Sequence, residues 1–208
     1  MPDAALQQDA AEMAKFVVGL GNPGDEYAPT RHNLGYMVLE ALAARWNVGR
    51  GRRMRGAQVL NARVPGPGRR PRRVVLVRPQ EYMNRSGKAV RDVAAFYRVE
   101  RQNMLIVLDD MALGVGRLRC RAGGSAGGHK GLADVVAALG GEDVPRLRIG
   151  IGSPPNGMDG ADFVLQPFNA DEREMIRKAI ELAAQAVEDW VFKGIEYVME
   201  RYNRKEDN

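Results

Sequence analysis

Cysteine and histidine are scarce in this sequence, and their scarcity excludes several kinds of site. The 208 residues include one cysteine, Cys120, and two histidines, His32 and His129. A single cysteine cannot form a disulfide within the chain and indicates a reducing compartment. The sequence contains no CxxC pair, no Gly-x-Ser-x-Gly elbow and no histidines at metal-ligand spacing. It therefore predicts no metal and no serine-nucleophile chemistry.

Long apolar runs and targeting signals are also absent. No stretch approaches the ~18 apolar residues that a membrane-spanning helix requires. Residues 1–14 carry three acidic residues and no lysine or arginine, unlike a secretory or transit peptide. We expect a cytoplasmic protein without membrane contact, with a disordered N-terminal extension over residues 1–14, one domain over residues 15–202 and a frayed tail over residues 203–208.

Positive charge is present but moderate. A net charge of +5 and a pI near 9.5 permit a polyanionic partner without requiring one. Residues 49–56 and 64–73 are rich in glycine, proline and arginine and flank a strand candidate at residues 57–63. We expect two surface loops of a hairpin there. The sequence leaves open whether they are merely solvated or contact nucleic-acid phosphates.

Short apolar runs alternate with helical periodicity along the chain, which favours an α/β fold. Strands are expected at residues 16–20, 74–77, 104–108, 117–121 and 146–152. Helices are expected around residues 37–46, 90–97, 132–139 and 170–202, with Gly194 interrupting or ending the last. Asn33 is a plausible N-cap of the first helix.

Polar side chains follow three of these strands, at the edge where open α/β sheets bind ligands. Asn22 and His32 follow the first, Asn84 the second, and Asp109 and Asp110 the third. Two adjacent carboxylates suggest a metal site or an acid/base pair, but neighbours on an extended chain point apart, so we expect only one to face the cleft. A histidine, a carboxylate and asparagines suit general-base hydrolysis of an ester.

Several sequence blocks carry a resemblance to a known family. GLGNPGDEYAPTRHNLG, EYMNRSG, LDD, GGSAGGHKGL and RLRIGIG occur between Gly19 and Gly152. In order and spacing they are similar to the bacterial-type peptidyl-tRNA hydrolases. The resemblance implies a monomeric enzyme that cleaves the ester between a peptide and the 3′ ribose of tRNA, recycling peptidyl-tRNA released from ribosomes. Its partner would be the acceptor stem and CCA end, with no cofactor.

The resemblance also assigns roles to individual residues. His32 would be the general base, Asp109 would orient it, and Asn22 would complete the catalytic set. The substrate-binding residues would be Tyr27, Tyr82, Met83, Asn84, His129 and Lys130, and the tRNA 5′ phosphate would be clamped by Arg121 and Arg148.

Two departures from the family pattern affect this reading. Lys130 stands where the family has asparagine, and Ala112 stands where it has an acid.

The glycine-rich stretch at residues 122–128 has no Gly-Lys-Ser/Thr ending, so a nucleotide cofactor is not expected. We interpret this stretch as room for the peptidyl or CCA end.

Together, these features predict a single-domain, three-layer α/β/α sandwich around a twisted mixed, mostly parallel sheet, with hydrolase activity. Two other classes remain open. One is an RNA-binding module of the intron-splicing-factor type on the same fold, which a test of intron-RNA binding would identify. The other is an aminopeptidase-like metalloenzyme, which would need a cluster of metal ligands.

Overall fold

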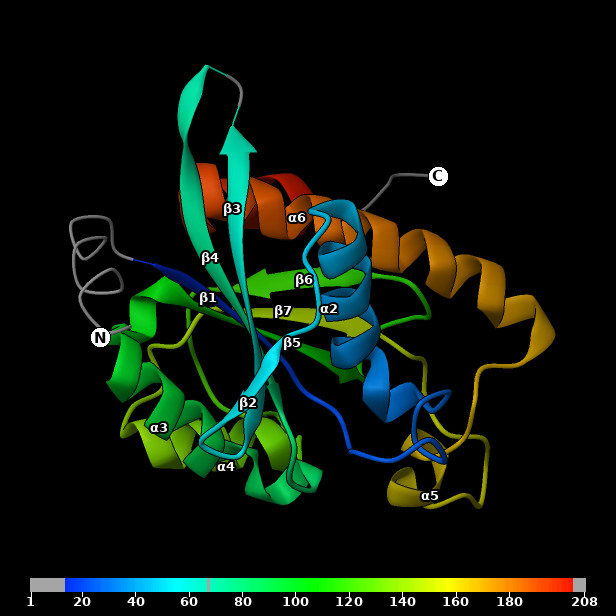
Figure 1. Ribbon diagram of the computed structural model, residues 1–208. Coiled ribbons are helices and arrows are strands. Elements are labelled where there is room, and N and C mark those ends of the chain that lie inside the picture. The colour runs from blue at the N-terminus through cyan, green and yellow to red at the C-terminus, as the bar shows by residue number, and fades with distance from the viewer. Residues whose placement is uncertain (1–13, 67, 204–208) are drawn as a thin grey trace.

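The chain is described by a computed structural model over residues 14–66 and 68–203. Within that range seven strands form one sheet in the order β2-β3-β4-β1-β5-β7-β6 (Figure 1). The strands are β1 (Lys15–Gly19), β2 (Arg52–Met54), β3 (Ala57–Gly66), β4 (Arg69–Pro79), β5 (Met104–Asp110), β6 (Leu118–Arg121) and β7 (Arg146–Gly150). The four central strands are parallel, while β2, β3 and β6 pair antiparallel at the edges. The predicted mixed, mostly parallel sheet is confirmed.

Helices cover both faces of this sheet (Figure 1). Helices α2 (Leu34–Arg45) and α6 (Ala170–Tyr202) pack on one face, and α3 (Ser86–Tyr97) and α4 (Lys130–Leu139) on the other. Strand β1 is buried on both sides, because Val17 faces the first pair of helices and Val18 faces the second. The three-layer sandwich is therefore confirmed. Among the described residues, none of the helices is both long enough and apolar enough to cross a membrane.

Shorter elements lie between these layers. Helix α5 (Gly160–Val164) and the 3-10 turns η1 (Arg31–Asn33), η2 (Met83–Arg85) and η3 (Arg101–Asn103) complete the described structure. Helix α6 has a non-helical residue at Gly194, with φ 85° and ψ 176°, which confirms the expected interruption.

The arginine-rich segments are the main correction to the predicted elements. Residues 49–56 and 64–73 were expected to be loops, but they contain β2, the end of β3 and the start of β4. Their side chains do not alternate between apolar and polar, so the strand period was not visible. Pairing of β3 with β4 supplies the backbone hydrogen bonds instead.

Most of the predicted terminal extension and tail, residues 1–13 and 204–208, lies outside the described residues. Their inner boundaries, Ala14 and Asn203, belong to the folded domain. Ala14 is buried. The Asn203 side chain accepts from the Cys120 N–H (2.7 Å) and donates to the Cys120 carbonyl (3.0 Å). Asn203 is thus a tether between the end of α6 and β6 rather than part of a frayed tail.

Candidate active site

Close contact between α2 and the sheet brings His32 to the carboxyl end of β5. A Cβ at Gly35 would lie 2.4 Å from the carbonyl oxygen of Val107, and a Cβ at Gly19 would lie 2.3 Å from the carbonyl oxygen of Gly35. Only glycine at these two positions lets the helix start this near the strands. His32, on the turn η1 just before α2, is therefore held over Asp109, the penultimate residue of β5.

The turn η1 is also attached to the start of α6. Arg31, beside His32, is buried and pairs with Glu172 at 2.8 Å. Its guanidinium carbon lies 4.4 Å and 4.7 Å from the ring centres of Phe163 and Phe168. These contacts restrict the backbone that carries His32.

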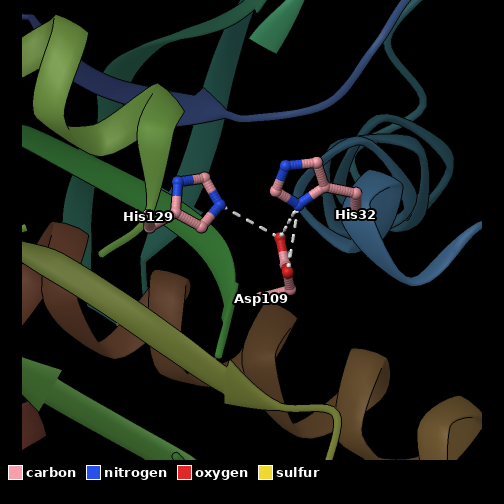
Figure 2. Close-up of side chains that lie close together, drawn as sticks. All are labelled: His32, Asp109 and His129. Carbon is pink, nitrogen blue, oxygen red and sulfur yellow. Dashed lines mark hydrogen bonds and ion pairs between the residues drawn. The ribbon is translucent and has the colours of Figure 1, made fainter. Parts of the chain in front are cut away.

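Asp109 accepts hydrogen bonds from both histidines (Figure 2). His32 Nδ1 lies 2.9 Å and 3.1 Å from its two carboxylate oxygens, and His129 Nε2 lies 3.1 Å from Oδ1. Burial favours the neutral acid, but the hydrogen bonds from His129 and His32 outweigh it and hold the pKa of Asp109 well below its usual range. The carboxylate is therefore charged and only accepts.

His129 uses both ring nitrogens within the protein. It is the N-cap of α4, where its Nδ1 accepts from the Leu132 N–H at 3.1 Å. Because Nδ1 is an acceptor, the proton resides on Nε2 and is donated to Asp109. His129, predicted to bind substrate, lines the cleft and also donates to the carboxylate. Its place directly before an apolar helical pattern was the signal for a cap.

Among the residues that the structure describes, none hydrogen-bonds to the second ring nitrogen of His32. With Nδ1–H donated to Asp109, its Nε2 carries a lone pair. The ligand atoms of His32, Asp109 and His129 lie within 4.8 Å of one another, a grouping that sequence spacing could not reveal. Such atoms could in principle hold a metal ion, but His129 Nε2 carries a proton in this arrangement. The three groups as placed form a hydrogen-bonded network.

Asn22 does not line the cleft; it is buried and hydrogen-bonded to Met83 and to Asn33, the residue after His32. Its side-chain Oδ1 accepts from the Met83 N–H at 2.8 Å, and its backbone exchanges two hydrogen bonds with the Asn33 side chain, at 2.7 Å and 3.0 Å. Asn33 occupies the predicted N-cap position of α2 but makes no side-chain capping bond, because its amide is engaged with Asn22. The Asn22 Nδ2 group is left to donate elsewhere.

A cleft of about 760 Å³ opens at the carboxyl edge of the sheet. His32, Asp109, His129, Lys130 and Arg148 contribute its polar wall. The opposite, apolar wall is lined by Met111, Ala112, Val164 and Leu165. Lys130, the first residue of α4, is exposed at the rim.

Both neighbouring carboxylates of β5 border this cleft, which corrects the expectation that only one would. Asp109 turns to the histidines, whereas Asp110 pairs with the Arg148 guanidinium. Asp110 also accepts from the Ala112 N–H at 2.8 Å. The cleft therefore contains a second, separate ion pair.

The remaining predicted site residues do not line the cleft. Tyr27 and Tyr82 pack edge to face with ring centres 6.4 Å apart, and Met83 is buried against Gly131. Asn84 is exposed on η2. These residues lie on the Asn22 side of the cluster, to which the Met83 N–H connects them.

The two arginines predicted to bind phosphate lie on one face of the β6–β7 pair. Arg121 stands opposite Arg146, and Arg148 is two residues further along β7. Side chains in such a diagonal relation are roughly 7 Å apart, a spacing that allows one phosphate to contact both. Arg121 is exposed, while Arg148 is already paired with Asp110.

Arg146, next to this pair, was not singled out from the sequence. It is buried and donates to the carbonyls of Val144, Gly124, Ser125 and Glu142. The side chain thus fastens the glycine-rich segment that precedes α4. Arg146 is one of two arginines that alternate with apolar residues in β7, so the sequence did not distinguish it from an ordinary exposed cation.

The fold is a three-layer α/β sandwich with a His–Asp–His cluster at the carboxyl edge of its sheet. A sequence model described as "Peptidyl-tRNA hydrolase" matches residues 16–208. The peptidyl-tRNA hydrolase of Symbiobacterium thermophilum is 46% identical over 191 residues, covering 92% of this chain and 100% of the relative. That of Bacillus cytotoxicus is 42% identical over 193 residues, covering 91% and 99%.

Solved structures agree with these relatives. The crystal structure of peptidyl-tRNA hydrolase from Acinetobacter baumannii superposes with a TM-score of 0.83 at 33% identity, covering 92% of this chain and 95% of that one. A peptidyl-tRNA hydrolase crystallised with N-propanol gives a TM-score of 0.84 at 32% identity, covering 94% and 97%. The chain belongs to the peptidyl-tRNA hydrolase family. The predicted resemblance and enzyme class are confirmed.

Proposed function

We propose that this chain hydrolyses the ester between a peptide, or an N-blocked aminoacyl group, and the 3′ ribose of tRNA, with His32 as general base. One observation carries the mechanism. His32 donates Nδ1–H to a buried, charged Asp109 and keeps Nε2 free at a cleft. A histidine in this arrangement takes a proton from water, and the carboxylate stabilises the resulting imidazolium.

Charge that develops on the ester oxygen needs donors, and two groups support that role. The Asn22 amide is oriented by Met83 and Asn33, so its Nδ2 is preorganised. The first N–H groups of α4, on Lys130 and Gly131, have no intrahelical partner, and the positive end of the helix dipole favours an anion there. Preorganised donors of this kind supply a large part of catalysis in acyl transfer.

Substrate contacts are proposed on both sides of this centre. Asn84, with Tyr27, Tyr82 and Met83, would contact the peptide or CCA end on the Asn22 side. Arg121 and Arg148 would hold the 5′ phosphate of the acceptor stem, and their common strand-pair face supports this. We further propose that the domain predicted over residues 15–202, extended to Ala14 and Asn203, acts as a monomer in the cytoplasm, where peptidyl-tRNA is released from ribosomes.

A direct assay tests the proposal. Purified protein should hydrolyse N-acetyl-aminoacyl-tRNA and spare free aminoacyl-tRNA. His32→Ala should lower kcat by ~10²–10⁴-fold, the usual contribution of a general base. Arg177→Gln, on the exposed side of α6, is the control and should leave kcat unchanged. Near-normal kcat in a folded His32→Ala protein would contradict the mechanism.

A further inference from the structure

The arginines between residues 50 and 73 carry the whole positive balance of the chain. This stretch contains nine arginines and no aspartate or glutamate. Taking these nine from the 31 basic residues leaves 22, against 26 acidic residues, so the rest of the chain is net acidic. The stretch forms β2, β3 and the start of β4, at the sheet edge opposite β6. Positive charge is therefore concentrated in one region.

Three of these arginines converge on two aromatic rings at the end of α3. Arg52 Nη2 donates to the Tyr97 hydroxyl at 3.4 Å, and the Arg73 guanidinium carbon lies 5.5 Å from the centre of the Tyr97 ring. The Arg55 guanidinium carbon lies 5.3 Å from the centre of the Phe96 ring. The two rings touch edge to face at 5.2 Å. We call Arg52, Arg55, Arg73, Phe96 and Tyr97 the arginine face.

Carboxylates do not neutralise this face. Within residues 14–66 and 68–203, Arg52, Arg55 and Arg73 form no ion pair with a carboxylate. Their contacts with the two aromatic rings are attractive but leave the positive charge in place. Arg55 has φ 51° at the β2–β3 turn, a backbone region that favours glycine or asparagine. An anionic ligand would supply the missing negative charge.

The two aromatic rings of the arginine face lie away from the catalytic cluster. Helix α3 begins at Ser86, directly after η2, and Phe96 and Tyr97 lie at its other end. Arg55 reaches the Phe96 ring from the β2–β3 turn, which lies beside Glu81 and Ala89. Twelve helical residues span about 18 Å at the usual rise. The hairpin also extends past its neighbour, because β1 pairs with β4 only at residues 74–77 (Figure 1). An RNA strand held here would not need to enter the cleft.

We propose that the arginine face is a second RNA-binding surface, which holds phosphate groups independently of the hydrolytic cleft. Planar guanidinium groups bind phosphate oxygens in a bidentate manner. Phe96, which is 45% exposed, offers a ring on which an unpaired base stacks. The phosphates come from one of two sources: the body of the tRNA whose CCA end occupies the cleft, or a separate structured RNA. The inference goes beyond the proposed function and does not depend on the role of His32.

A charge-matched comparison of variants tests this surface. The triple variant Arg52→Gln, Arg55→Gln, Arg73→Gln is compared with Arg177→Gln, Lys178→Gln, Arg201→Gln on α6, which removes the same charge elsewhere. The probe is a fluorescein-labelled RNA duplex without a CCA end, titrated over a range of salt concentrations. The triple glutamine variant of the arginine face should bind the duplex at least about tenfold more weakly than the parent at ~0.1 M salt. The slope of the logarithm of its binding constant against the logarithm of salt concentration should fall in magnitude by about two to three. The affinity of the α6 variant for the duplex should fall much less.

A third variant and a kinetic comparison complete the test. Arg52→Lys, Arg55→Lys, Arg73→Lys keeps the charges but not the bidentate geometry, so it should bind the duplex with an affinity between those of the parent and the glutamine variant. This comparison separates charge loss from misfolding. A higher KM for full-length N-acetyl-aminoacyl-tRNA, with minimal CCA-ended substrates unaffected, would identify the tRNA body as the source. Weaker duplex binding without a KM change would identify a separate RNA.

Equal losses in the face and α6 variants, or no loss in either, would overturn the proposal. Binding to vesicles of phosphatidylglycerol is measured for the same variants. If the glutamine variant of the arginine face still binds RNA but no longer binds the vesicles, the proposal is also overturned, because the surface would then be a lipid site.

Discussion

His129 hydrogen-bonds to the Leu132 N–H and to the Asp109 carboxylate, and one substitution can remove the second bond while keeping the first. His129→Asn keeps a capping acceptor for the Leu132 N–H but removes the donor to Asp109. The pKa of the Asp109 carboxyl should then rise toward its usual range. A carboxylate with a depressed pKa stabilises the folded state above the ordinary aspartate pKa, and this contribution is lost as pH falls through the depressed value.

The variant should therefore be less stable at pH 7, by about 1–3 kcal/mol for a hydrogen bond to a charged group. Its free energy of unfolding should also change less between pH 5 and pH 2 than that of the parent. Urea unfolding across this range measures both. An unchanged pH dependence would mean that His129 does not support the Asp109 charge.

Lys130 lies at the cleft rim, so restoring the family residue should have a small effect. Lys130→Asn should keep kcat/KM for N-acetyl-aminoacyl-tRNA within about tenfold, or ~1.4 kcal/mol of barrier. The reason is that its side chain is exposed and lies outside the hydrogen-bonded histidine cluster. A much larger loss would show that the ammonium binds substrate directly.

At this scale the sequence predicted the positions of isolated polar residues better than their connections. His32 and Asp109 follow strands whose ends meet, so their proximity was predictable from topology. The bonds of Asn33 to Asn22 and of Arg146 to Gly124 join residues 11 and 22 positions apart, and no local pattern marks them. Such contacts depend on tertiary packing alone.

The glycine-rich segment before α4 depends on one buried side chain. Arg146→Met should destabilise the protein by on the order of 3 kcal/mol, because it leaves the buried carbonyl of Val144 without this donor. It should also raise KM more than it lowers kcat, since the segment borders the cleft through Gly127 and Gly128. Arg119→Met, on the exposed face of β6, is the control for the stability measurement. Equal stability of the two variants would contradict this role.

The end of α6 protects the only thiol. Burial raises the pKa of Cys120 to about 12, so at pH 8 the thiol is protonated and unreactive in the folded chain. Asn203→Ala removes two hydrogen bonds to the Cys120 backbone and should cost about 1–3 kcal/mol. Labelling of Cys120 by a thiol reagent at pH 8 should become faster. Asn156→Ala, in an exposed loop, should leave the labelling rate unchanged.

Elements with a clear apolar period were predictable, and those without one were not. Strands β1 and β5 are short apolar runs buried on both faces. Strand β2 consists of Arg52, Arg53 and Met54, and it exists because β3 provides a pairing edge. Composition alone predicted a loop there, since arginine has no preference that distinguishes a strand from a loop.

Charge over the whole molecule should control the KM for tRNA substrates, and Asp110 should raise this KM by pairing with Arg148. Asp110→Asn should lower KM for full-length substrate about two- to fivefold at low salt, equivalent to roughly 0.5–1 kcal/mol, because it releases the Arg148 guanidinium. The gain should shrink as salt rises. Asp162→Asn removes the same charge from α5, outside the cleft lining, and should change KM less. Equal gains would point to net charge rather than to Arg148.

The place where the chain enters the domain has a practical consequence for handling the protein. Lys15 begins β1 beside Val74 of the long hairpin, and Phe16 packs edge to face on Tyr97 at 5.4 Å. The cleft lies at the opposite end of the same strand. An affinity handle or a sensor-chip linkage fused ahead of Ala14 would leave the hydrolytic end open to tRNA but would crowd the arginine face. Attachment beyond Asn203 would instead leave the arginine face open and would lie next to Arg121, because Asn203 is anchored to the backbone of Cys120. The two ends of the chain therefore suit measurements on different surfaces of the molecule.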